Sequence, residues 1–155
     1  MVIELVKDRP IKPRECTTTR PVPQHLQTEA DALVKLLLET GIIEPVPTEE
    51  VTDWISPAFF VPKEGGKGVR MVTDFTRLNA YVARPVHPFP MAHEITKRIP
   101  PGTRYFCKMD PTQGYHQIPL AKESRHLTTF LLPSGRYTYT RGPICLLYTS
   151  DAADE

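Results

Sequence analysis

Asp110 is the acidic residue whose surroundings most suggest chemistry. It follows the largely apolar run 105–109 and precedes Pro111. An acid at the end of a strand can bind Mg²⁺, which takes one or two protein carboxylates and completes its shell with waters and substrate phosphates. A turn that ends before a proline explains the same residues. Two-metal catalysis needs further carboxylates nearby, so Asp110 alone leaves both interpretations open.

Three basic residues surround a glycine-rich turn. Lys63, Lys67 and Arg70 flank or interrupt the run Gly65–Gly68. Lysine supplies a point charge, arginine a planar fork, and glycine lets the backbone approach an anion. The pattern therefore fits a phosphate clamp, although it also fits a solvated hairpin tip. It is not a Walker A loop, because the Gly-x-x-x-x-Gly-Lys-Ser/Thr spacing is absent.

The segment after Asp110 adds an aromatic residue to the candidates. Tyr115 follows Gly114, and its ring could either belong to the core or pack against a sugar. His116 has no metal-ligating partner at a suitable spacing. Cys107 lies in a predicted strand and is most simply a small buried hydrophobe. The last two residues therefore indicate no metal site.

A helix is predicted over residues 29–40, ahead of the basic turn. Thr28 and Asp31 form a variant of the capping box, and leucines recur at helical spacing. Gly41 suits the position just after the helix, where a left-handed backbone is common.

Two hairpins are expected to carry the candidate residues. The first pairs residues 58–61 with 69–72 around the basic turn. The second pairs residues 127–132 with 136–140 around a Pro-Ser-Gly turn.

Other elements are shorter. A strand is predicted over residues 105–109, a helix over 92–99 and an extended piece over 117–120. Helices and hairpins alternate without repeats or a regular βαβ pattern, which indicates a mixed α+β fold.

The charge of the chain is unevenly distributed. The 155 residues have a net charge of +1, yet residues 54–144 contain thirteen Lys/Arg and only five Asp/Glu. This basic middle favours a nucleic-acid partner. The sequence offers no apolar stretch long enough to span a membrane and no secretory signal at its start. Its three cysteines are too widely spaced for a disulfide framework or a zinc knuckle.

Short motifs follow one another in a fixed order over residues 29–144. In chain order they are Leu38–Pro45, Ser56–Ala58, Val61–Lys63, Arg70, Thr73–Phe75, Leu78–Asn79, Pro85, Pro88, Pro90, Lys108–Asp110, Gly114–Leu120, Thr129–Phe130, Gly135–Tyr137 and Arg141–Pro143. Together they resemble the reverse transcriptase domain of gypsy-type LTR-retrotransposon and retroviral Pol polyproteins. The resemblance implies the fingers and the first part of the palm of a right-hand polymerase, truncated before the remaining catalytic hairpin.

The resemblance also assigns roles at the reaction centre. Asp110 would be the first catalytic aspartate and would bind the two Mg²⁺ ions of the intact enzyme, with Mn²⁺ as an alternative ion. The Pro111 carbonyl would be an additional metal ligand. Lys63 and Arg70 would bind the triphosphate of the incoming dNTP, where negative charge grows in the transition state.

Further roles concern the sugar and the template. By resemblance, Val72 would lie near the templating base. Tyr115 would lie under the sugar and exclude a ribose 2′-hydroxyl. Gln117 and the basic surface, with Lys67, would line the path of the RNA or DNA template–primer. The parent polyprotein would add ribonuclease H and integrase domains, would need no membrane, and would act in cytoplasmic virus-like particles.

The sequence departs from the family pattern at two places. Thr76 stands where many relatives have a basic residue. The resemblance stops at Ile144, before the Tyr/Phe-x-Asp-Asp hairpin, and this chain contains no Asp-Asp pair. Residues 145–155 instead look like translated read-through of a transposase-type sequencing adapter. We therefore expect a Pro-rich extended lead-in over 1–27, a polymerase segment over 28–144 and a non-native tail over 145–155.

The expected function is that of a fragment of an RNA-directed DNA polymerase, which transfers the nucleotidyl group of a dNTP to a primer 3′-hydroxyl and releases pyrophosphate. One aspartate cannot hold both metal ions, so we expect no primer extension on poly-rA by this chain alone. A non-catalytic nucleic-acid-binding module derived from a retroelement is the alternative. A fragment that exposes a sheet edge and does not fold stably is a third interpretation.

Overall fold

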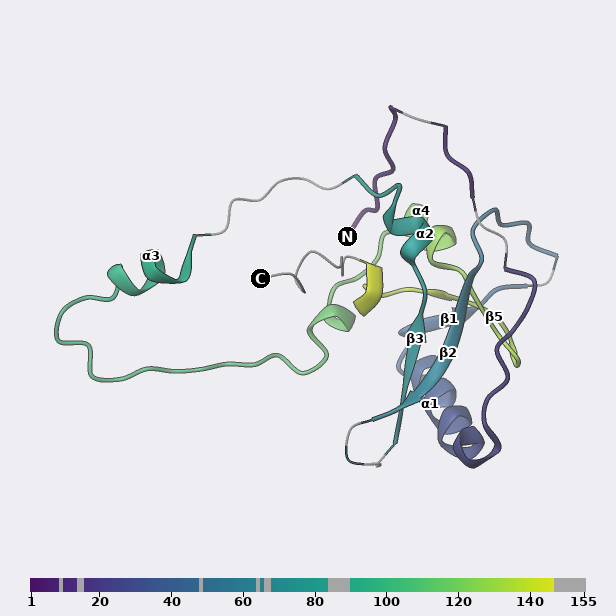
Figure 1. The fold of residues 1–155 in the computed structure, drawn as a ribbon, viewed down its shortest axis with the longest axis horizontal. Helices are drawn as coiled ribbons and strands as arrows, with labels where there is room; N and C mark the ends of the chain where they lie inside the picture. Colours follow the sequence, from purple (N-terminus) through teal and green to yellow (C-terminus); the bar gives the residue numbers. More distant parts are fainter. Residues whose placement is uncertain are drawn as a thin grey trace.

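The computed structural model describes residues 1–8, 10–13, 16–47, 49–63, 65, 68–83 and 90–146, in a mixed arrangement of helices and strands (Figure 1). The α-helices are α1 (Gln27–Glu39), α2 (Thr76–Asn79), α3 (Ala92–Lys97) and α4 (Lys122–Arg125). The strands are β1 (Ile43–Pro45), β2 (Ser56–Pro62), β3 (Val69–Thr73), β4 (Phe130–Leu132) and β5 (Gly135–Tyr139). Short 3₁₀ helices are η1 (Gln24–Leu26), η2 (Gly114–Gln117), η3 (His126–Thr128) and η4 (Ile144–Leu146).

The five strands form one sheet in the order β1-β5-β4-β2-β3. Both predicted hairpins are present, because β2 pairs antiparallel with β3 and β4 pairs antiparallel with β5. The hairpins join through a short parallel pairing of β2 with β4, in which Ser56 lies opposite Phe130. Strand β1 completes the sheet by pairing antiparallel with β5.

The predicted helix is confirmed as α1, but the predicted cap at Thr28 is wrong. The helix begins at Gln27 because η1 runs directly into it, with Leu26 already in a right-handed helical conformation. Thr28 therefore lies inside the first turn. Asp31 accepts a hydrogen bond of 2.9 Å from Gln27 Nε2 and takes no part in a capping box.

The end of α1 follows the prediction. Gly41 has a φ of 64°, in the left-handed region. Its amide donates to the carbonyl of Leu38 at 3.0 Å, and the amide of Ile42 donates to the carbonyl of Leu37 at 2.9 Å. This pair of bonds is a Schellman motif, which satisfies carbonyls that the helix leaves without partners. It turns the chain directly into β1.

The core lies between α1 and the sheet. Helix α1 contacts β1 and β3, which form the two edges of the sheet. Aromatic rings fill the centre, where Phe130 and Tyr139 have ring centroids 5.0 Å apart and Phe75 packs edge-on against Tyr139. Phe75 and Phe130 are fully buried. In the described part of the chain, no helix is long and apolar enough to cross a membrane.

The first residues of the chain pack onto this core. Ile3 is buried, and its amide donates to Ser124 Oγ at 2.9 Å. Leu5 forms an antiparallel bridge with Val82. The N-terminal strand-like segment therefore ties together α4 and the chain that follows α2, although no regular helix or strand forms before η1 in the described part of residues 1–23.

Residues 90–113 project away from the sheet as a long arm that carries α3 (Figure 1). The predicted helix over 92–99 is confirmed as the shorter α3. The predicted strand over 105–109 is wrong, because those residues form no strand and are all exposed. A strand needs a neighbour to pair its amide and carbonyl groups, and no described residue pairs with this segment. The sequence pattern showed apolar side chains, but it could not show a missing partner strand.

Candidate functional site

The β2–β3 hairpin positions two of the predicted phosphate ligands. Arg70 lies on β3 opposite Val61 of β2, and Lys63 follows β2 by one residue. The amide of Lys63 donates to the carbonyl of Gly68 at 3.0 Å, which closes the hairpin. Gly68 has a φ of 90°, a conformation that favours glycine. Both cationic side chains are exposed, and Lys67 lies outside the described residues.

The segment after Asp110 forms a compact turn. Gln113 adopts φ 50° and ψ 45°, the left-handed conformation, immediately before η2. The amide of His116 donates to the Gln113 carbonyl at 2.9 Å. Gln117 donates its side-chain amide to the carbonyl of Thr112 at 2.8 Å. These bonds fix the turn, in which Gln113, Tyr115 and Gln117 are exposed and His116 is half-buried.

A cavity of about 210 Å³ lies where this turn meets α1, β3 and β5. It is lined by Leu33, Leu37, Lys63, Val69, Arg70, Met71, Thr73, Phe75, Gln113, His116, Tyr139, Pro143 and Ile144. We call it the hairpin pocket. It brings the two predicted phosphate ligands, Lys63 and Arg70, together with the turn that follows Asp110.

The charged residues that line the hairpin pocket are all positive among those described. Among the described residues that line it there are two cations and no carboxylate. Its polar neutral groups come from Gln113, His116, Thr73 and Tyr139, and the last two share a hydrogen bond of 3.1 Å between their hydroxyl groups. Burial lowers the pKa of His116 below its ordinary value of 6.5. This combination suits an anion that carries an adjoining apolar or planar group.

Asp110 and Pro111 lie outside this pocket. Both are exposed, at the base of the projecting arm. Among the described residues, no group of three or more His, Cys, Asp or Glu is placed to hold a metal ion. The described residues therefore do not by themselves fit a two-metal site, since such a site needs several carboxylates around the ions.

The remaining predicted residues also lie away from the pocket lining. Val72 pairs with Phe59 in the hairpin and does not line the pocket. Strand alternation places its side chain on the face opposite Met71 and Thr73, which is also the face of the exposed Arg70. Tyr115 lies in η2 and is 46% exposed. The side-chain amide of Gln117 is engaged within the turn.

Of the residues that line the pocket, only Lys63 and Arg70 are predicted site residues, and the turn residues Gln113 and His116 are not. The sequence offers His116 only as a possible metal ligand, without a metal-ligating partner at a suitable spacing. The signal that could have identified it is its place in the Gly114–Leu120 motif. Gln113 offers no such signal, because nothing in the sequence reveals a left-handed conformation at a residue that is not glycine.

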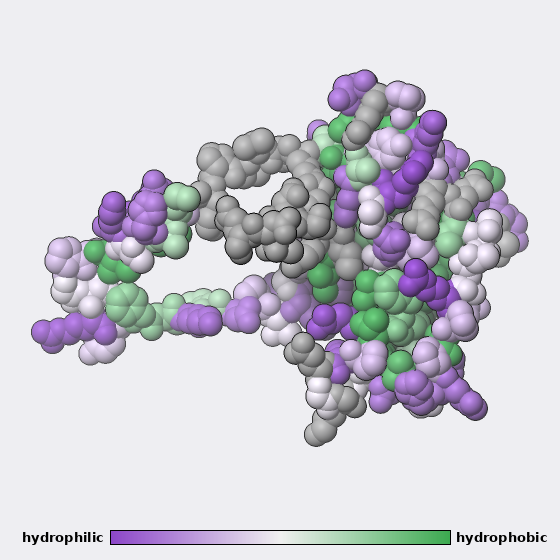
Figure 2. All heavy atoms as spheres, viewed as in Figure 1, coloured by the Kyte–Doolittle hydropathy of each residue, from purple (hydrophilic) through white to green (hydrophobic). Residues whose placement is uncertain are grey.

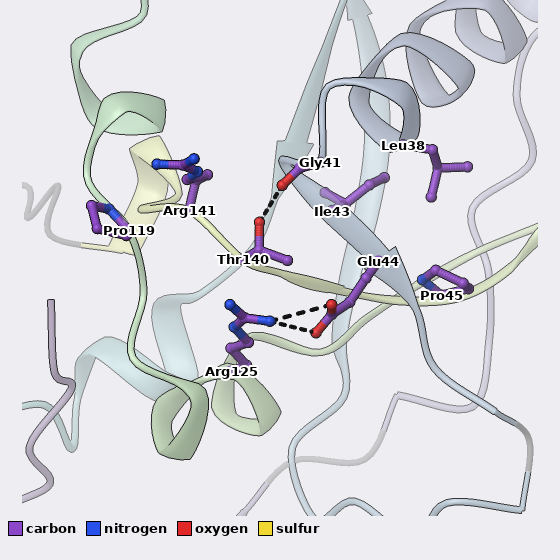
Figure 3. A pocket seen from close by; sticks show the side chains of 9 residues that line it. All are labelled: Leu38, Gly41, Ile43, Glu44, Pro45, Pro119, Arg125, Thr140 and Arg141. Carbon is purple, nitrogen blue, oxygen red and sulfur yellow. Dashed lines mark hydrogen bonds and ion pairs between the residues drawn. The ribbon is translucent and has the colours of Figure 1, made fainter.

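A second cavity, of about 450 Å³, lies beside β1 and α4 (Figure 3). Arg125 of α4 donates from Nη1 to both carboxylate oxygens of Glu44, at 3.1 and 3.3 Å. Thr140 donates its hydroxyl to the carbonyl of Gly41 in the same view. None of the predicted site residues lines this cavity, and its Arg125 is already neutralised. We therefore interpret the ion pair as a clamp between α4 and β1.

Comparison with curated proteins identifies relatives of this chain. The retrovirus-related Pol polyprotein from transposon opus of Drosophila melanogaster is 32% identical over 130 residues, which cover 81% of this chain and 12% of the relative. That from transposon gypsy of the same organism is 31% identical over 149 residues, which cover 93% of this chain and 14% of the relative. The chain thus spans only a small part of the relatives it matches.

Solved structures share the fold. Native prototype foamy virus protease–reverse transcriptase matches with a TM-score of 0.66 and 23% identity, over 90% of this chain and 18% of that chain. The foamy viral protease–reverse transcriptase in complex with double-stranded DNA matches with a TM-score of 0.59 and 19% identity, over 93% of this chain and 24% of that chain. No family model matches the sequence. The relatives and the shared fold together place this chain in the family of retrovirus-related Pol polyproteins, as a reverse-transcriptase-like segment.

Proposed function

We propose that this chain is the fingers and partial palm of an RNA-directed DNA polymerase, and that the hairpin pocket binds the triphosphate of an incoming dNTP. The observation that carries the proposal is the meeting of Lys63 and Arg70 with the turn that follows Asp110. Cations held on a hairpin that meets the turn after Asp110 suit nucleotidyl transfer, because they stabilise the negative charge that develops on the triphosphate oxygens.

The proposal gives the chain a nucleic-acid partner. A related solved structure holds double-stranded DNA. For this chain we propose that an RNA or DNA template–primer lies along residues 54–144. In that segment the Lys and Arg residues greatly outnumber the Asp and Glu residues. Contacts of Lys and Arg with phosphates would dominate such binding and make it weaken with salt.

Asp110 would supply one carboxylate for Mg²⁺ or Mn²⁺ in the complete polymerase, with the Pro111 carbonyl beside it. The other carboxylates would come from outside the described residues, which hold no group of three or more potential metal ligands. We accordingly propose binding of nucleotide, without catalysis, for the chain alone. Ribonuclease H and integrase domains, and action in cytoplasmic particles, belong to the proposed parent polyprotein.

The test is the binding of dTTP to the 155-residue chain by isothermal titration calorimetry. The Lys63→Ala and Arg70→Ala variants should each raise the Kd by about 10-fold to 100-fold, because a hydrogen bond to a charged group contributes about 1.5–3 kcal/mol. Lys97→Ala is the matched control, since Lys97 is an exposed cation of α3 on the projecting arm. It should leave the Kd unchanged.

A loss of affinity of the same size in all three variants would contradict the proposal, because it would show that dTTP binds to diffuse positive charge. A non-catalytic nucleic-acid-binding module also explains the basic segment. It does not explain why two cations and an ordered turn line one cavity whose described lining holds no carboxylate. Affinity for RNA without any affinity for dTTP would favour that module.

A further inference from the structure

His116 and Gln113 line the hairpin pocket together with Lys63 and Arg70. They enter the pocket from a different part of the chain than the two cations. The backbone of Gln113, with a left-handed φ of 50°, reverses the chain immediately before η2. Residues held in such unfavourable conformations cluster at sites of function. The turn therefore contributes side chains to whatever the pocket binds.

The size of the pocket limits which part of a ligand it holds. Its volume is about 210 Å³. Sites that enclose an entire small-molecule ligand usually have about 300–1,000 Å³. The hairpin pocket therefore accommodates part of a nucleotide, and its two cations select the phosphates. His116, as a lining residue, then lies beside that anion.

The imidazole of His116 has one nitrogen available for such a contact. Its Nδ1 lies 3.5 Å from Oε1 of Gln113, at the outer limit of a hydrogen bond. In the tautomer that donates from Nδ1 to this oxygen, Nε2 is unprotonated. Nε2 can then take up a proton from the solvent and donate it in a hydrogen bond to a phosphate oxygen.

The charges around His116 determine when it becomes a cation. The β2–β3 hairpin presents Lys63 and Arg70, β5 presents the neutral Tyr139, and α1 presents only leucines. Among the described lining residues no carboxylate offsets these cations, and burial already lowers the pKa of His116. A bound phosphate reverses the balance, because an opposite charge within about 4–6 Å raises the pKa of a histidine.

We propose that His116 is a third phosphate ligand of the hairpin pocket and takes up one proton from water when the phosphate binds. The inference rests on the proposed nucleotide function and assigns a further residue to that site. Binding of a phosphate would then strengthen as the pH falls through the pKa of His116 in the complex. That contribution would be lost as the pH rises above this value.

The experiment is an NMR titration of the histidine rings of the full chain, with and without inorganic tripolyphosphate. His116→Gln identifies the resonance of His116 by its loss. Without ligand, His116 should titrate below the ordinary value of 6.5. With saturating tripolyphosphate, its midpoint should rise by about 1–3 pH units. His25, His93 and His126, which do not line the pocket, serve as internal controls and should shift much less.

The Lys63→Ala variant separates this inference from the proposed function. Loss of the His116 response in Lys63→Ala, with the fold retained, would support a single shared site. Binding of tripolyphosphate that depends on Lys63 but leaves the His116 midpoint unchanged would overturn the inference and preserve the proposed pocket. Absence of any binding that depends on Lys63 would overturn both.

Discussion

Gln113 shows how one residue shapes the candidate site. Its left-handed backbone, φ 50° and ψ 45°, reverses the chain between Asp110 and His116. A left-handed conformation costs a residue with a side chain about 1–2 kcal/mol. The side chain of Gln113 lines the pocket, and its Oε1 lies 3.5 Å from Nδ1 of His116.

Substitution at Gln113 should separate the backbone from the side chain. Gln113→Gly adopts the same φ without the steric cost, whereas Gln113→Val places a β-branched residue in a conformation that it strongly disfavours. We expect Gln113→Val to open the turn more readily than Gln113→Gly by about 1–2 kcal/mol. Amide hydrogen exchange of His116, whose amide donates to the Gln113 carbonyl, measures this directly. Equal exchange rates in the two variants would show that the left-handed conformation is not required.

Individual residues differ in how far the sequence could place them. Lys63 and Arg70 come together because a glycine-rich turn and a two-residue period are local signals. Asp110 could be identified by type but not by surroundings, since its neighbours depend on pairing between distant segments. The position of Val72 on the opposite face follows only once the register with Phe59 is known. Residue types thus indicate which chemistry a side chain could perform, whereas its position relative to other side chains follows only from the fold.

At the scale of elements, α1 illustrates a well-specified boundary and a poorly specified one. Its end is fixed by Gly41, the residue type that left-handed caps require. Its start was misplaced because η1 continues into the helix and makes a separate cap at Thr28 unnecessary. The presence of both hairpins and of α1 is predictable from the sequence, because each forms through contacts between residues that are close together in the chain.

Substitution of Gly41 should destabilise the protein without any steric clash. No atom lies within 4 Å of the place where a Cβ would be added, so the cost is purely conformational. Gly41→Ala should lower the free energy of unfolding by about 1–2 kcal/mol. Gly41→Asn, the matched variant, should lose less, because asparagine tolerates this conformation better. Urea denaturation followed by circular dichroism checks both values, and an unchanged stability of Gly41→Ala would contradict the role of the cap.

At the scale of the whole molecule, the contacts that sequence reasoning missed are long-range ones. The parallel pairing of Ser56 with Phe130 and the hydrogen bond from Ile3 to Ser124 join distant parts of the chain. No periodicity in the sequence indicates such pairs. These contacts place the β2–β3 hairpin, β5 and the η2 turn around one pocket, so the site depends on the assembled sheet and could not be derived from any single segment.

The projecting arm is the part of the molecule that this assembly leaves uncovered. Tyr105, Phe106 and Met109 are 92%, 73% and 85% exposed. In Figure 2 the arm carries hydrophobic and hydrophilic residues side by side, away from the main body. Exposed apolar side chains on a segment without strand partners favour association between molecules. We therefore expect the chain to associate as its concentration rises.

Replacing Tyr105, Phe106 and Met109 together by serine should reduce this association, which sedimentation velocity measures over a range of concentrations. The melting temperature should change by no more than about 2 °C, because these side chains are exposed and their loss removes little buried area. Arg104→Ser with Lys108→Ser is the matched control on the same segment. It should not reduce association, since it removes charges that keep copies apart. If the unsubstituted chain stays monomeric at every concentration, the apolar residues of the arm do not drive association, and other contacts cover them.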